Sequence, residues 1–478
     1  MVCVNVNQAL EAMTHTSPLR AAIIGAGPSG FYAAGQLLAV EEPQFAVDLY
    51  DRLPTPYGLV RSGVAPDHPK IKSVTRAYDK TSQHERFRFF GHVELGSDVS
   101  REQLLERYHV VCYTLGTSTD KRLGIPGEDL RGSHAATEFV AWYNGHPDHS
   151  GLEVDLQGAR QAVVVGAGNV AIDVARMLAL SPEELEITDT ADHAIAVLNA
   201  SGVEEITILA RRGPLQAAFT NPELLEMGEL ARADVEVVGA ELDDLSAVAL
   251  QEADKTRRRN VEIVQEYAAR PKTGKPITVR FRFLASPVEL LGDENGRIRG
   301  VKIENNEIVV RDDGSLAARG TGRFDEIPAQ LVFRSIGYTG QPIPGIPFDD
   351  RRGLIRNEGG RVTDEAGTHL AGEYVSGWIK RGPSGVIGTN KKDAQDTVTK
   401  IIEDAAAGRL NEPVSDDIEA MIESCAEHVV TWEGWLAIDA VETDVGQKSV
   451  PARPRVKLTE WEALREAARG AAARPARR

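Results

Sequence analysis

One glycine-rich segment of the chain is Gly25-Ala26-Gly27-Pro28-Ser29-Gly30. It follows residues 19–24, an apolar run typical of a buried strand, and precedes residues 29–40, which have the spacing of a helix. The glycines of such a loop permit a tight turn and let the backbone approach a pyrophosphate, while the helix N-terminus adds partial positive charge. The order of strand, glycine loop and helix therefore predicts a dinucleotide-binding site.

Two acids follow this loop on the next predicted strand, residues 46–50. Asp51 comes at the end of the strand, where an acid accepts a hydrogen bond from the ribose of a bound dinucleotide. Asp48 is the competing candidate, but it lies inside the strand and is expected to point to solvent. We therefore assign the ribose contact to Asp51.

A second loop of the same kind is Gly166-Ala167-Gly168-Asn169-Val170-Ala171, between a predicted strand at 161–165 and a predicted helix at 169–180. The next predicted strand, 206–210, is followed by Arg211 and Arg212, where an NAD site would place an acid. Because guanidinium groups match phosphate oxygens bidentately, the pair predicts NADP rather than NAD. An insertion of about 25 residues before this strand makes the spacing longer than usual, and two solvated arginines at a strand end remain the alternative.

The three cysteines, Cys3, Cys112 and Cys425, lie far apart and form no CxxC pair or cluster motif. Any redox chemistry must therefore come from a bound organic cofactor. Two nucleotide folds without a cysteine pair suggest that hydride passes from NADPH to a flavin and leaves to an external acceptor.

Helical and strand patterns alternate along the 478 residues, which predicts an α/β fold with parallel sheets divided into two or three domains. Residues 51–76 contain several prolines and glycines and are expected to form a long ordered loop of functional importance. After an apolar strand at 331–336, glycine- and proline-rich sequence through Phe348 is expected to cross back into the first domain.

The net charge of −17 disfavours binding to nucleic acids or acidic membranes. No apolar run approaches the roughly 20 residues of a membrane helix, and residues 1–18 lack a secretory signal, so a cytoplasmic location is expected. Residues 181–205 and 241–254 are acidic. The tail from Arg453 to Arg478 has eight basic and three acidic residues, and it is expected to be a solvated and partly frayed end.

Four longer segments are more specific than the glycine loops. They are LPTPYGLVRSGVAPDHPKIK (53–72), GAGNVAIDVAR (166–176), RRGPLQAAFT (211–220) and SGWIKRGPSGVIGTNKKDAQDT (376–397). Together they resemble the adrenodoxin reductase family of ferredoxin–NADP reductases, in its bacterial branch, and the similarity runs from about Ala21 to Lys457. The resemblance implies two Rossmann-like domains of the glutathione reductase type. The FAD-binding domain would be 1–120 with 343–478, residues 1–18 being a flexible extension, and the NADP-binding domain would be 121–342.

The resemblance also implies which residues contact each nucleotide. With the glycines of the first loop, the FAD contacts would be Gly25, Gly27, Ser29, Gly30, Asp51, Leu59, Val99 of the GSDV segment, Trp378, Gly385, Val386 and Ile387. The NADP contacts would be Gly166, Ala167, Gly168, Asn169, Val170, Arg211, Arg212, Glu223 and Gly385.

His68 of the PDHP segment and Glu223 are implied by the resemblance to place the nicotinamide and tune hydride transfer. Taken alone, His68 could equally be a loop histidine bonded to backbone, and Glu223 an exposed acid at a helix start. The sequence departs from the family at Asn221-Pro222, and a proline at this point could alter how Glu223 reaches the nicotinamide ribose.

The electron acceptor implied by the resemblance is an acidic, ferredoxin-type iron–sulfur protein, reduced one electron at a time. Its docking site would be near Arg257, Arg258 and Arg259 on a predicted helix, with the basic tail as a second candidate. A solvated helix face explains the arginines equally well. Transfer to quinones or oxygen, a role like that of the small subunit of glutamate synthase, and a non-enzymatic NADP-sensing flavoprotein module are the alternatives; missing cluster cysteines weigh against the second.

Overall fold

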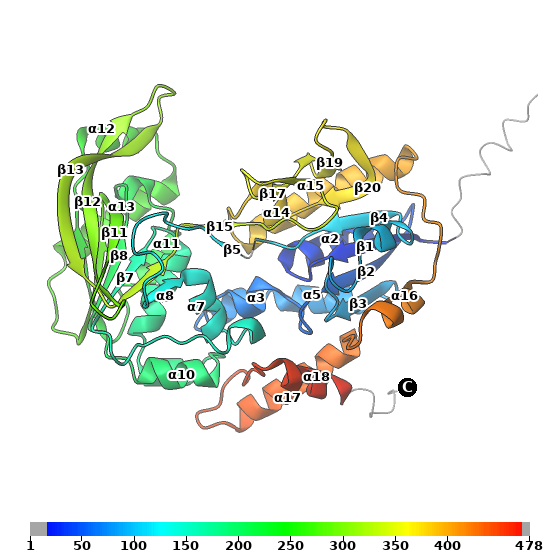
Figure 1. The fold of residues 1–478 in the computed structure, drawn as a ribbon, viewed down its shortest axis with the longest axis horizontal. Coiled ribbons are helices and arrows are strands. Elements are labelled where there is room, and N and C mark those ends of the chain that lie inside the picture. The colour runs from blue at the N-terminus through cyan, green and yellow to red at the C-terminus, as the bar shows by residue number, and fades with distance from the viewer. Residues whose placement is uncertain (1–16, 118, 471–478) are drawn as a thin grey trace, which may run out of the picture.

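The computed structural model describes residues 17–117 and 119–470, and it contains two α/β units side by side (Figure 1). The first unit surrounds a seven-stranded sheet and the second surrounds a six-stranded sheet. Two predicted segments lie outside the described residues: residues 1–16 of the extension that was expected to be flexible, and residues 471–478 at the end of the basic tail. Within the part described, no helix combines the length and apolar character needed to span a membrane.

The first sheet has the strand order β18-β19-β20-β4-β1-β2-β3. Five neighbouring strands of this sheet are parallel. They are β20 (His369–Val375), β4 (Val110–Tyr113), β1 (Leu19–Ile24), β2 (Phe45–Asp51) and β3 (Phe87–Gly91). The short strands β19 (Arg361–Thr363) and β18 (Asn357–Glu358) are antiparallel additions at one edge. The start and the late part of the chain therefore share one sheet.

Alternate residues of β1 enter two different cores, because neighbouring side chains of a strand point to opposite faces. One face is covered by α2 (Pro28–Leu38), α5 (Thr75–Ser82), α15 (Ile387–Ala406) and α17 (Trp432–Lys448), with α18 (Trp461–Arg469) packed on α17. The other is covered by α6 (Arg101–Leu105), α16 (Ile418–Cys425) and the ribbon of β16 (Phe348–Asp349) and β17 (Leu354–Ile355). Short helices α3 (Leu59–Ser62), α4 (Pro69–Lys72) and α14 (Trp378–Arg381) complete the unit.

The second sheet is entirely parallel, in the order β6-β14-β7-β8-β10-β9. Its strands are β6 (Ser133–Ala135), β14 (Leu331–Arg334), β7 (Gln161–Val165), β8 (Glu205–Leu209), β10 (Ile277–Arg282) and β9 (Ala233–Val238). Helices cover one face: α7 (Ala136–Tyr143), α8 (Asn169–Ala179), α9 (Pro182–Leu185), α10 (Asp192–Asn199), α11 (Asn221–Glu226) and α13 (Lys255–Ala269).

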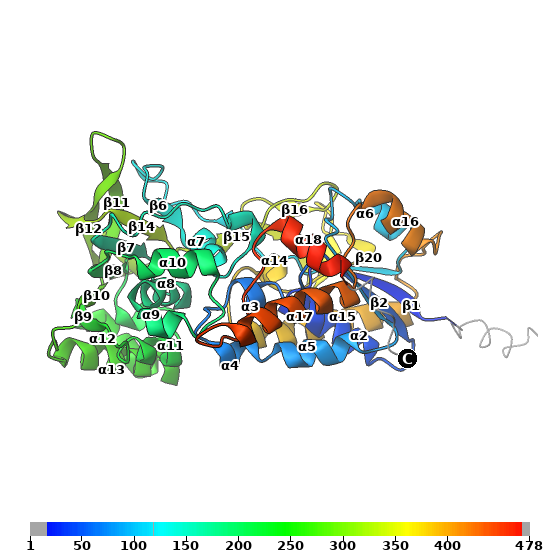
Figure 2. The ribbon, with the colours of Figure 1, turned by 90° about the horizontal axis from the view of Figure 1, so that it is seen from below.

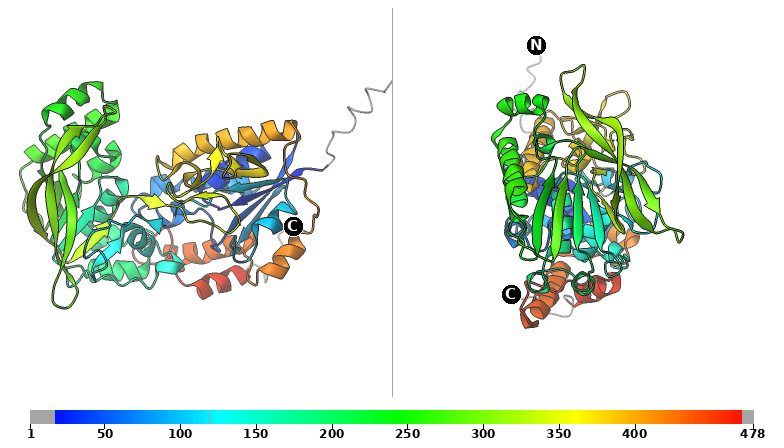
Figure 3. Two further views of the ribbon diagram at one scale, coloured as in Figure 1. Left: turned by 45° about the horizontal axis from the view of Figure 1, so that its top comes forward. Right: turned by 90° about the vertical axis from the view of Figure 1, so that its left-hand side faces the viewer.

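A curved antiparallel sheet covers the opposite face of the second unit (Figure 3). It consists of β11 (Ala285–Gly292), β12 (Ile298–Val310) and β13 (Leu316–Pro328), and α12 (Asp244–Glu252) contacts β12. Two short strands, β5 (Thr119–Asp120) and β15 (Tyr338–Thr339), pair antiparallel where the chain passes between the units (Figure 1). The chain therefore leaves the first unit and returns to it through adjacent segments.

The predicted elements agree closely with the structure where the pattern was regular. The strands at 19–24 and 161–165 have the predicted bounds, and the predicted helices 29–40 and 169–180 correspond to α2 and α8. The helix expected around the arginine triplet is α13. The insertion before β8 forms α9 and α10, while the ordered loop expected at 51–76 includes α3 and α4.

The expectation of a frayed basic tail is wrong for the described part, residues 453–470. Arg453 and Lys457 are buried, and residues after them form α18. The segment between α17 and α18 extends to the second unit, as Figures 1 and 2 both show. These basic side chains are buried because acids and carbonyl oxygens of distant segments accept their hydrogen bonds.

The expectation that Asp48 points to solvent is also wrong. Its side chain is buried on β2, opposite Arg88 in the register with β3. The Arg88 Nε and Nη2 groups donate to its two carboxylate oxygens at 2.7 and 2.6 Å, and the Tyr108 hydroxyl donates at 2.6 Å. Asp48 therefore stabilises the sheet, which leaves Asp51 as the acid at the strand end.

Replacing Asp48 by asparagine is expected to lower the unfolding free energy of the first unit by about 2–3 kcal/mol, because the negative charge and one of the two acceptor oxygens that face Arg88 and Tyr108 are lost. The measurement is denaturant unfolding followed by tryptophan fluorescence. The matched control is Glu419→Gln, which removes the 79%-exposed second partner of Arg88 and is expected to cost less than about 1 kcal/mol. Equal effects of the two substitutions would contradict the structural role of Asp48.

Candidate nucleotide and active sites

The first glycine loop is packed so closely that side chains are excluded at two positions. Gly25 has φ +111°, and a Cβ atom there would lie 2.7 Å from the Thr114 carbonyl oxygen. A Cβ atom at Gly30 would lie 2.0 Å from the Gly25 carbonyl oxygen. Gly27 is the N-cap of α2 and has no side chain to occupy the first amide groups of the helix. The loop therefore presents free backbone amides at a helix N-terminus, as phosphate binding requires.

Asp51 lies beside this loop, as expected from the sequence. Its carboxylate accepts hydrogen bonds from the Ala26 amide at 2.8 Å and from the Leu53 amide at 2.9 Å. Burial raises the pKa of Asp51, and these two amides oppose the shift. The acid thus holds the shape of the glycine loop.

Leu59 and Val99, two other residues implied for the first site, differ in exposure. Leu59 begins α3 and is 46% exposed, so its side chain is available to a ligand. Val99 is buried in the core, and its amide donates to the Glu94 carbonyl oxygen at 3.2 Å. This core also contains Ile24, the residue just before the glycine loop.

Segment 376–387 lies against the first glycine loop through a chain of hydroxyl groups. The Ser29 hydroxyl donates to Ser376 at 2.9 Å, and Ser376 donates to Asp393 of α15 at 3.1 Å. The Gly377 amide also donates to Asp393. These contacts join the first turn of α2 to segment 376–377 and to α15, although these parts of the chain are hundreds of residues apart.

Trp378 and the residues before α15 form the exposed side of this segment. The Trp378 ring stacks on Tyr338 with 5.7 Å between ring centroids and 16° between planes. Its indole Nε1–H is buried and donates to no acceptor in the described protein. Gly385 has φ +80°, and both it and Val386 are exposed, while Ile387 is the half-buried first residue of α15.

The second glycine loop is held by its own neighbours in a similar way. Gly166 has φ +145°, and a Cβ atom there would lie 2.1 Å from the Ser335 carbonyl oxygen, whereas Gly168 faces open space. Asn169 accepts a hydrogen bond from the Thr220 amide at 2.8 Å, and the Ala167 carbonyl oxygen accepts one from Ala218 at 2.7 Å. Val170 is half-buried at the start of α8. Segment 217–220 is therefore fixed beside the loop.

Arg211 and Arg212 follow β8, as expected, and their charges are not neutralised. Among the residues described, no carboxylate lies within ion-pair distance of either arginine. Burial lowers the pKa of Arg212, and the charges of Arg211, Arg257 and Arg311 lower it further. Arg212 and Arg257 also line a cavity of about 750 Å³. Because Glu252 and Asp254 also line this cavity, it is the unpaired charges of Arg211 and Arg212 that favour an anionic group such as a phosphate.

His68 and Glu223 meet at the contact between the two units. His68 is the N-cap of α4, and its Nε2 atom forms a hydrogen bond of 2.7 Å with Glu226 of α11. Ligand atoms of His68, Glu223 and Glu226 all lie within 4.8 Å of one another. Burial raises the pKa of Glu223, and the charge of His68 opposes this shift. Pro222 lies in the first turn of α11 and still permits this approach.

Three ligand atoms of this kind could also hold a metal ion. However, the Arg176 guanidinium already lies 3.6 Å from Glu226 and supplies positive charge there. Arg176 donates to Asp67 at 2.6 Å and to Asp173 at 2.8 Å. These side chains therefore form a network of ion pairs and hydrogen bonds that joins the loop before α4 to the second unit.

Glu226, Asp67 and Arg176 also belong to this network, although the sequence alone did not indicate them. Glu226 follows Glu223 by three residues, so the two share a face of α11. This spacing could have indicated that Glu226 lies near His68 as well. Asp67 precedes His68 directly. The role of Arg176 could not be read locally, because its partners come from both units.

Each arginine of the triplet on α13 has partners close to it in the chain. Arg258 donates to the carbonyl oxygens of Ala253 at 2.8 Å and Gln251 at 2.5 Å. Arg259 lies 3.0 Å from Glu262 and 2.8 Å from Glu266. Arg257 lies 3.6 Å from Asp254.

Comparison with known proteins gives full-length relatives. The chain is 48% identical over 446 residues to the NADPH-ferredoxin reductase FprA of Mycobacterium leprae, covering 91% of this chain and 95% of that protein. It is 40% identical over 467 residues to the mitochondrial NADPH:adrenodoxin oxidoreductase of Arabidopsis thaliana, covering 94% and 95%. No family model matches the chain.

A solved structure agrees with these sequence matches. The structure of Mycobacterium tuberculosis FprA in complex with NADPH superposes with a TM-score of 0.89 at 45% sequence identity, covering 95% of this chain and 100% of that one. The α/β fold with two dinucleotide-type units expected from the sequence is therefore confirmed. The chain belongs to the adrenodoxin reductase family of NADPH–ferredoxin reductases.

Proposed function

We propose that this chain takes hydride from NADPH on its second unit and passes the electrons one at a time, through FAD on its first unit, to a ferredoxin-type iron–sulfur protein. One observation carries the proposal. Segment 335–338 packs on the second glycine loop at Gly166 and stacks Tyr338 on Trp378 beside the first site. Only the four residues 335–338 therefore separate the two glycine-loop sites, so two nucleotides bound at these sites would lie close to each other. The names of the full-length relatives support the same activity.

The residues of the first unit fit an FAD molecule. The free amides at the start of α2 suit a pyrophosphate. The buried Nε1–H of Trp378, which has no acceptor in the described protein, could donate a hydrogen bond to FAD. FAD, when bound, supplies the chemistry that accepts a hydride and releases single electrons. The residues proposed to hold it are Gly25, Gly27, Ser29, Gly30, Asp51, Leu59, Val99, Trp378, Gly385, Val386 and Ile387. The corresponding domain would comprise 1–120 and 343–478.

The second unit, residues 121–342, is proposed to bind NADPH. Its glycine loop would hold the pyrophosphate. The arginine pair would hold the 2′-phosphate, because no carboxylate among the described residues neutralises Arg211 or Arg212. The contacts are Gly166, Ala167, Gly168, Asn169, Val170, Arg211, Arg212, Glu223 and Gly385 of the first unit.

His68 and Glu223 are proposed to place the nicotinamide. Hydride transfer depends on close stacking of two rings, so orientation matters more than proton transfer. His68 is held by Glu226 and lies at the contact of the units. It is thereby fixed where a small displacement would alter the approach of the two nucleotides.

The docking surface for the acidic partner is proposed to lie near Arg257, Arg258 and Arg259 on α13. Opposite charges accelerate and orient such encounters. Because Arg257 also lines the cavity with Arg212, Arg258 and Arg259 are the members whose replacement tests docking alone.

The overall proposal predicts that anaerobic NADPH will bleach the yellow protein and that an oxidised ferredoxin will restore its colour as it becomes reduced. Absorbance spectra follow both steps.

The double variant Arg258→Glu with Arg259→Glu is expected to slow ferredoxin reduction while sparing ferricyanide reduction. Arg297→Glu with Arg299→Glu, exposed arginines on β12 and the turn before it, is the control for charge alone. A colourless protein unable to take up FAD would refute the proposal, and equal loss with both acceptors would refute this docking surface.

Replacing Arg211 and Arg212 by glutamine is expected to raise the KM for NADPH about tenfold or more, since each charged hydrogen bond to phosphate contributes about 1.5–3 kcal/mol. The KM for NADH should change little. Steady-state kinetics with ferricyanide measure both constants, and Arg319→Gln on β13 is the control because it breaks an exposed ion pair with Glu307. Equal effects on NADPH and NADH would remove the 2′-phosphate from this site.

The variant His68→Ala is expected to slow flavin reduction by NADPH by about tenfold or more, because the positioning of the nicotinamide is loosened. FAD content should be unchanged. Stopped-flow absorbance measures the rate, and His369→Ala is the matched control because it removes an exposed histidine–glutamate pair. An unchanged rate would make His68 a structural residue only.

A further inference from the structure

The loop that carries His68 is tied to the second unit at three successive points. The first two, Asp67 with Arg176 and His68 with Glu226, belong to the network described above. The third is at Lys72, the last residue of α4, whose ammonium lies 2.7 and 2.8 Å from the two carboxylate oxygens of Asp189. Because His68 is the N-cap of α4 and Lys72 ends it, the contact at Asp189 fixes the other end of the same short helix.

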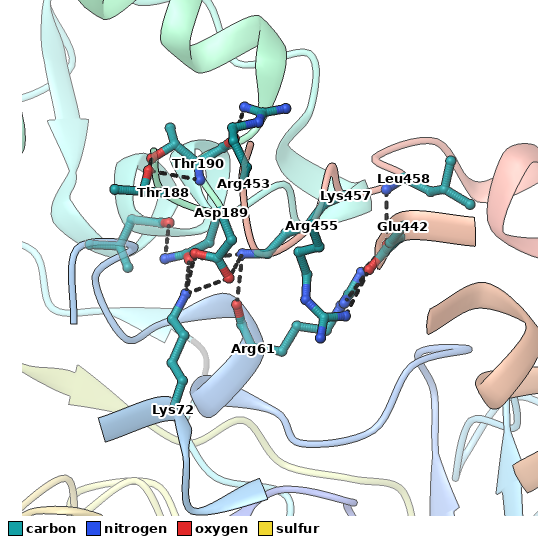
Figure 4. Close-up of polar contacts among 12 residues, drawn as sticks. Arg61, Lys72, Thr188, Asp189, Thr190, Glu442, Arg453, Arg455, Lys457 and Leu458 are labelled. Atoms are coloured by element: carbon teal, nitrogen blue, oxygen red, sulfur yellow. Dashed lines mark hydrogen bonds and ion pairs between the residues drawn. The ribbon is translucent and has the colours of Figure 1, made fainter. Parts of the chain in front are cut away.

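Asp189 lies in the insertion that lengthens the second nucleotide motif, between α9 and α10. It is buried, and a second lysine approaches it: the Lys457 ammonium lies 3.2 Å from its Oδ2 atom (Figure 4). Lys457 also donates to the Arg61 carbonyl oxygen at 3.2 Å and to Asn144 Oδ1 at 3.2 Å. One ammonium group thus bonds to α3 of the first unit and to two segments of the second.

The segment that carries Lys457, residues 449–458, is held in turn by Glu442 of α17. The Val456 amide donates to the Glu442 carbonyl oxygen, and the Leu458 amide donates to its carboxylate, both at 2.9 Å. The same fully buried carboxylate accepts two hydrogen bonds from Arg61 (Figure 4). We call residues 449–458 the C-terminal strap.

The strap also bonds to the insertion beside Asp189. Arg453 donates to the Thr190 carbonyl oxygen at 3.3 Å and pairs with Asp192 at the start of α10. The insertion therefore receives the strap on one side and Lys72 on the other.

Charge makes this arrangement specific. Burial by itself would raise the pKa of Asp189, but Lys457 and Lys72 hold that pKa well below its ordinary value. Burial lowers the pKa of Lys457, and Asp189 opposes that shift while Lys72 and Arg61 add to it. A buried charge without its partner is costly, so displacement of the insertion from the strap would expose or isolate these groups.

We propose that Lys72, Asp189 and Lys457 form an interdomain lock, in which the C-terminal strap and the insertion hold α4, and with it His68, in fixed register against the second unit. Lys457 is then a positioning residue for hydride transfer, although it lies outside the nucleotide loops. This consequence for transfer rests on the proposed function, which puts NADPH on the second unit and FAD on the first; the lock itself is a property of the protein alone.

The test compares Lys457→Met with the matched control Lys448→Met in the full chain loaded with FAD. Lys457→Met leaves Asp189 paired with Lys72, so no buried carboxylate is left alone. Lys448 forms an exposed i,i+4 pair with Asp444 on the same stretch of chain. Lys72→Met, which leaves Asp189 paired with Lys457, is the second variant and serves if Lys457→Met fails to fold.

Amide hydrogen exchange, measured without NADPH, reports the lock directly. Lys457→Met is expected to speed exchange in segments 67–74 and 188–192 while Lys448→Met does not. Unchanged exchange in both segments for Lys457→Met and Lys72→Met would overturn the lock, whatever the enzyme's activity.

Transfer is measured by stopped-flow reduction of the flavin by NADPH, with FAD content and the Kd for NADP⁺ determined in parallel. Loosened positioning predicts a rate lower by about tenfold or more with FAD content and Kd unchanged. An unchanged rate at unchanged binding would overturn the positioning role of Lys457. Failure of the wild-type protein to be reduced by NADPH would instead refute the proposed function and leave the exchange result standing.

Discussion

The contact between the two α/β units is the constraint on which the proposed chemistry depends, because a hydride moves only between groups held at close range. Charged side chains make this contact specific: Asp67 pairs with Arg176, and Lys72 pairs with Asp189. An apolar contact tolerates sliding, whereas a buried ion pair loses its stabilisation when either partner moves away. The charged contacts therefore favour one relative placement of the units.

The same requirement for close approach governs the two glycine loops. Gly25 packs on the backbone of Thr114, and Gly166 packs on the backbone of Ser335. In each unit the loop lies at the carboxyl ends of parallel strands, where the first amides of a helix are free to meet an anion. The neighbouring strand thus fixes the loop, and the segment that continues from Ser335 to Tyr338 brings the second loop close to Trp378.

The insertion between α8 and β8 has a structural role that a binding motif alone does not explain. It lengthens the path from the glycine loop to Arg211, yet β8 still lies beside β7 and the arginines still follow its end. The added residues cover the side of the second unit that faces α4 and the C-terminal strap. The insertion that lengthens the motif spacing is therefore part of the contact between the two units.

Local sequence was sufficient wherever the deciding interaction lies between near neighbours. The strands at 19–24 and 161–165 and the helices after both glycine loops follow from apolar periodicity and from glycine at a turn, which depend on a few adjacent residues. The family could also be inferred, because its longest motifs are contiguous. The placement of Asp51 followed from its position at the end of a strand.

Tertiary structure decided which charges are buried and what they contact. Asp48 was expected at the surface, but Arg88 of the neighbouring strand and Tyr108 enclose it. Lys457 belonged to a tail expected to be solvated, yet it meets Asp189, which is 268 residues earlier in the chain (457 − 189). A lysine has the same local pattern whether it is solvated or paired, because its free energy depends on the dielectric environment and on a partner that folding alone brings near. The sequence by itself determined the nucleotide loops and the family, whereas the fold determined how the two units are joined.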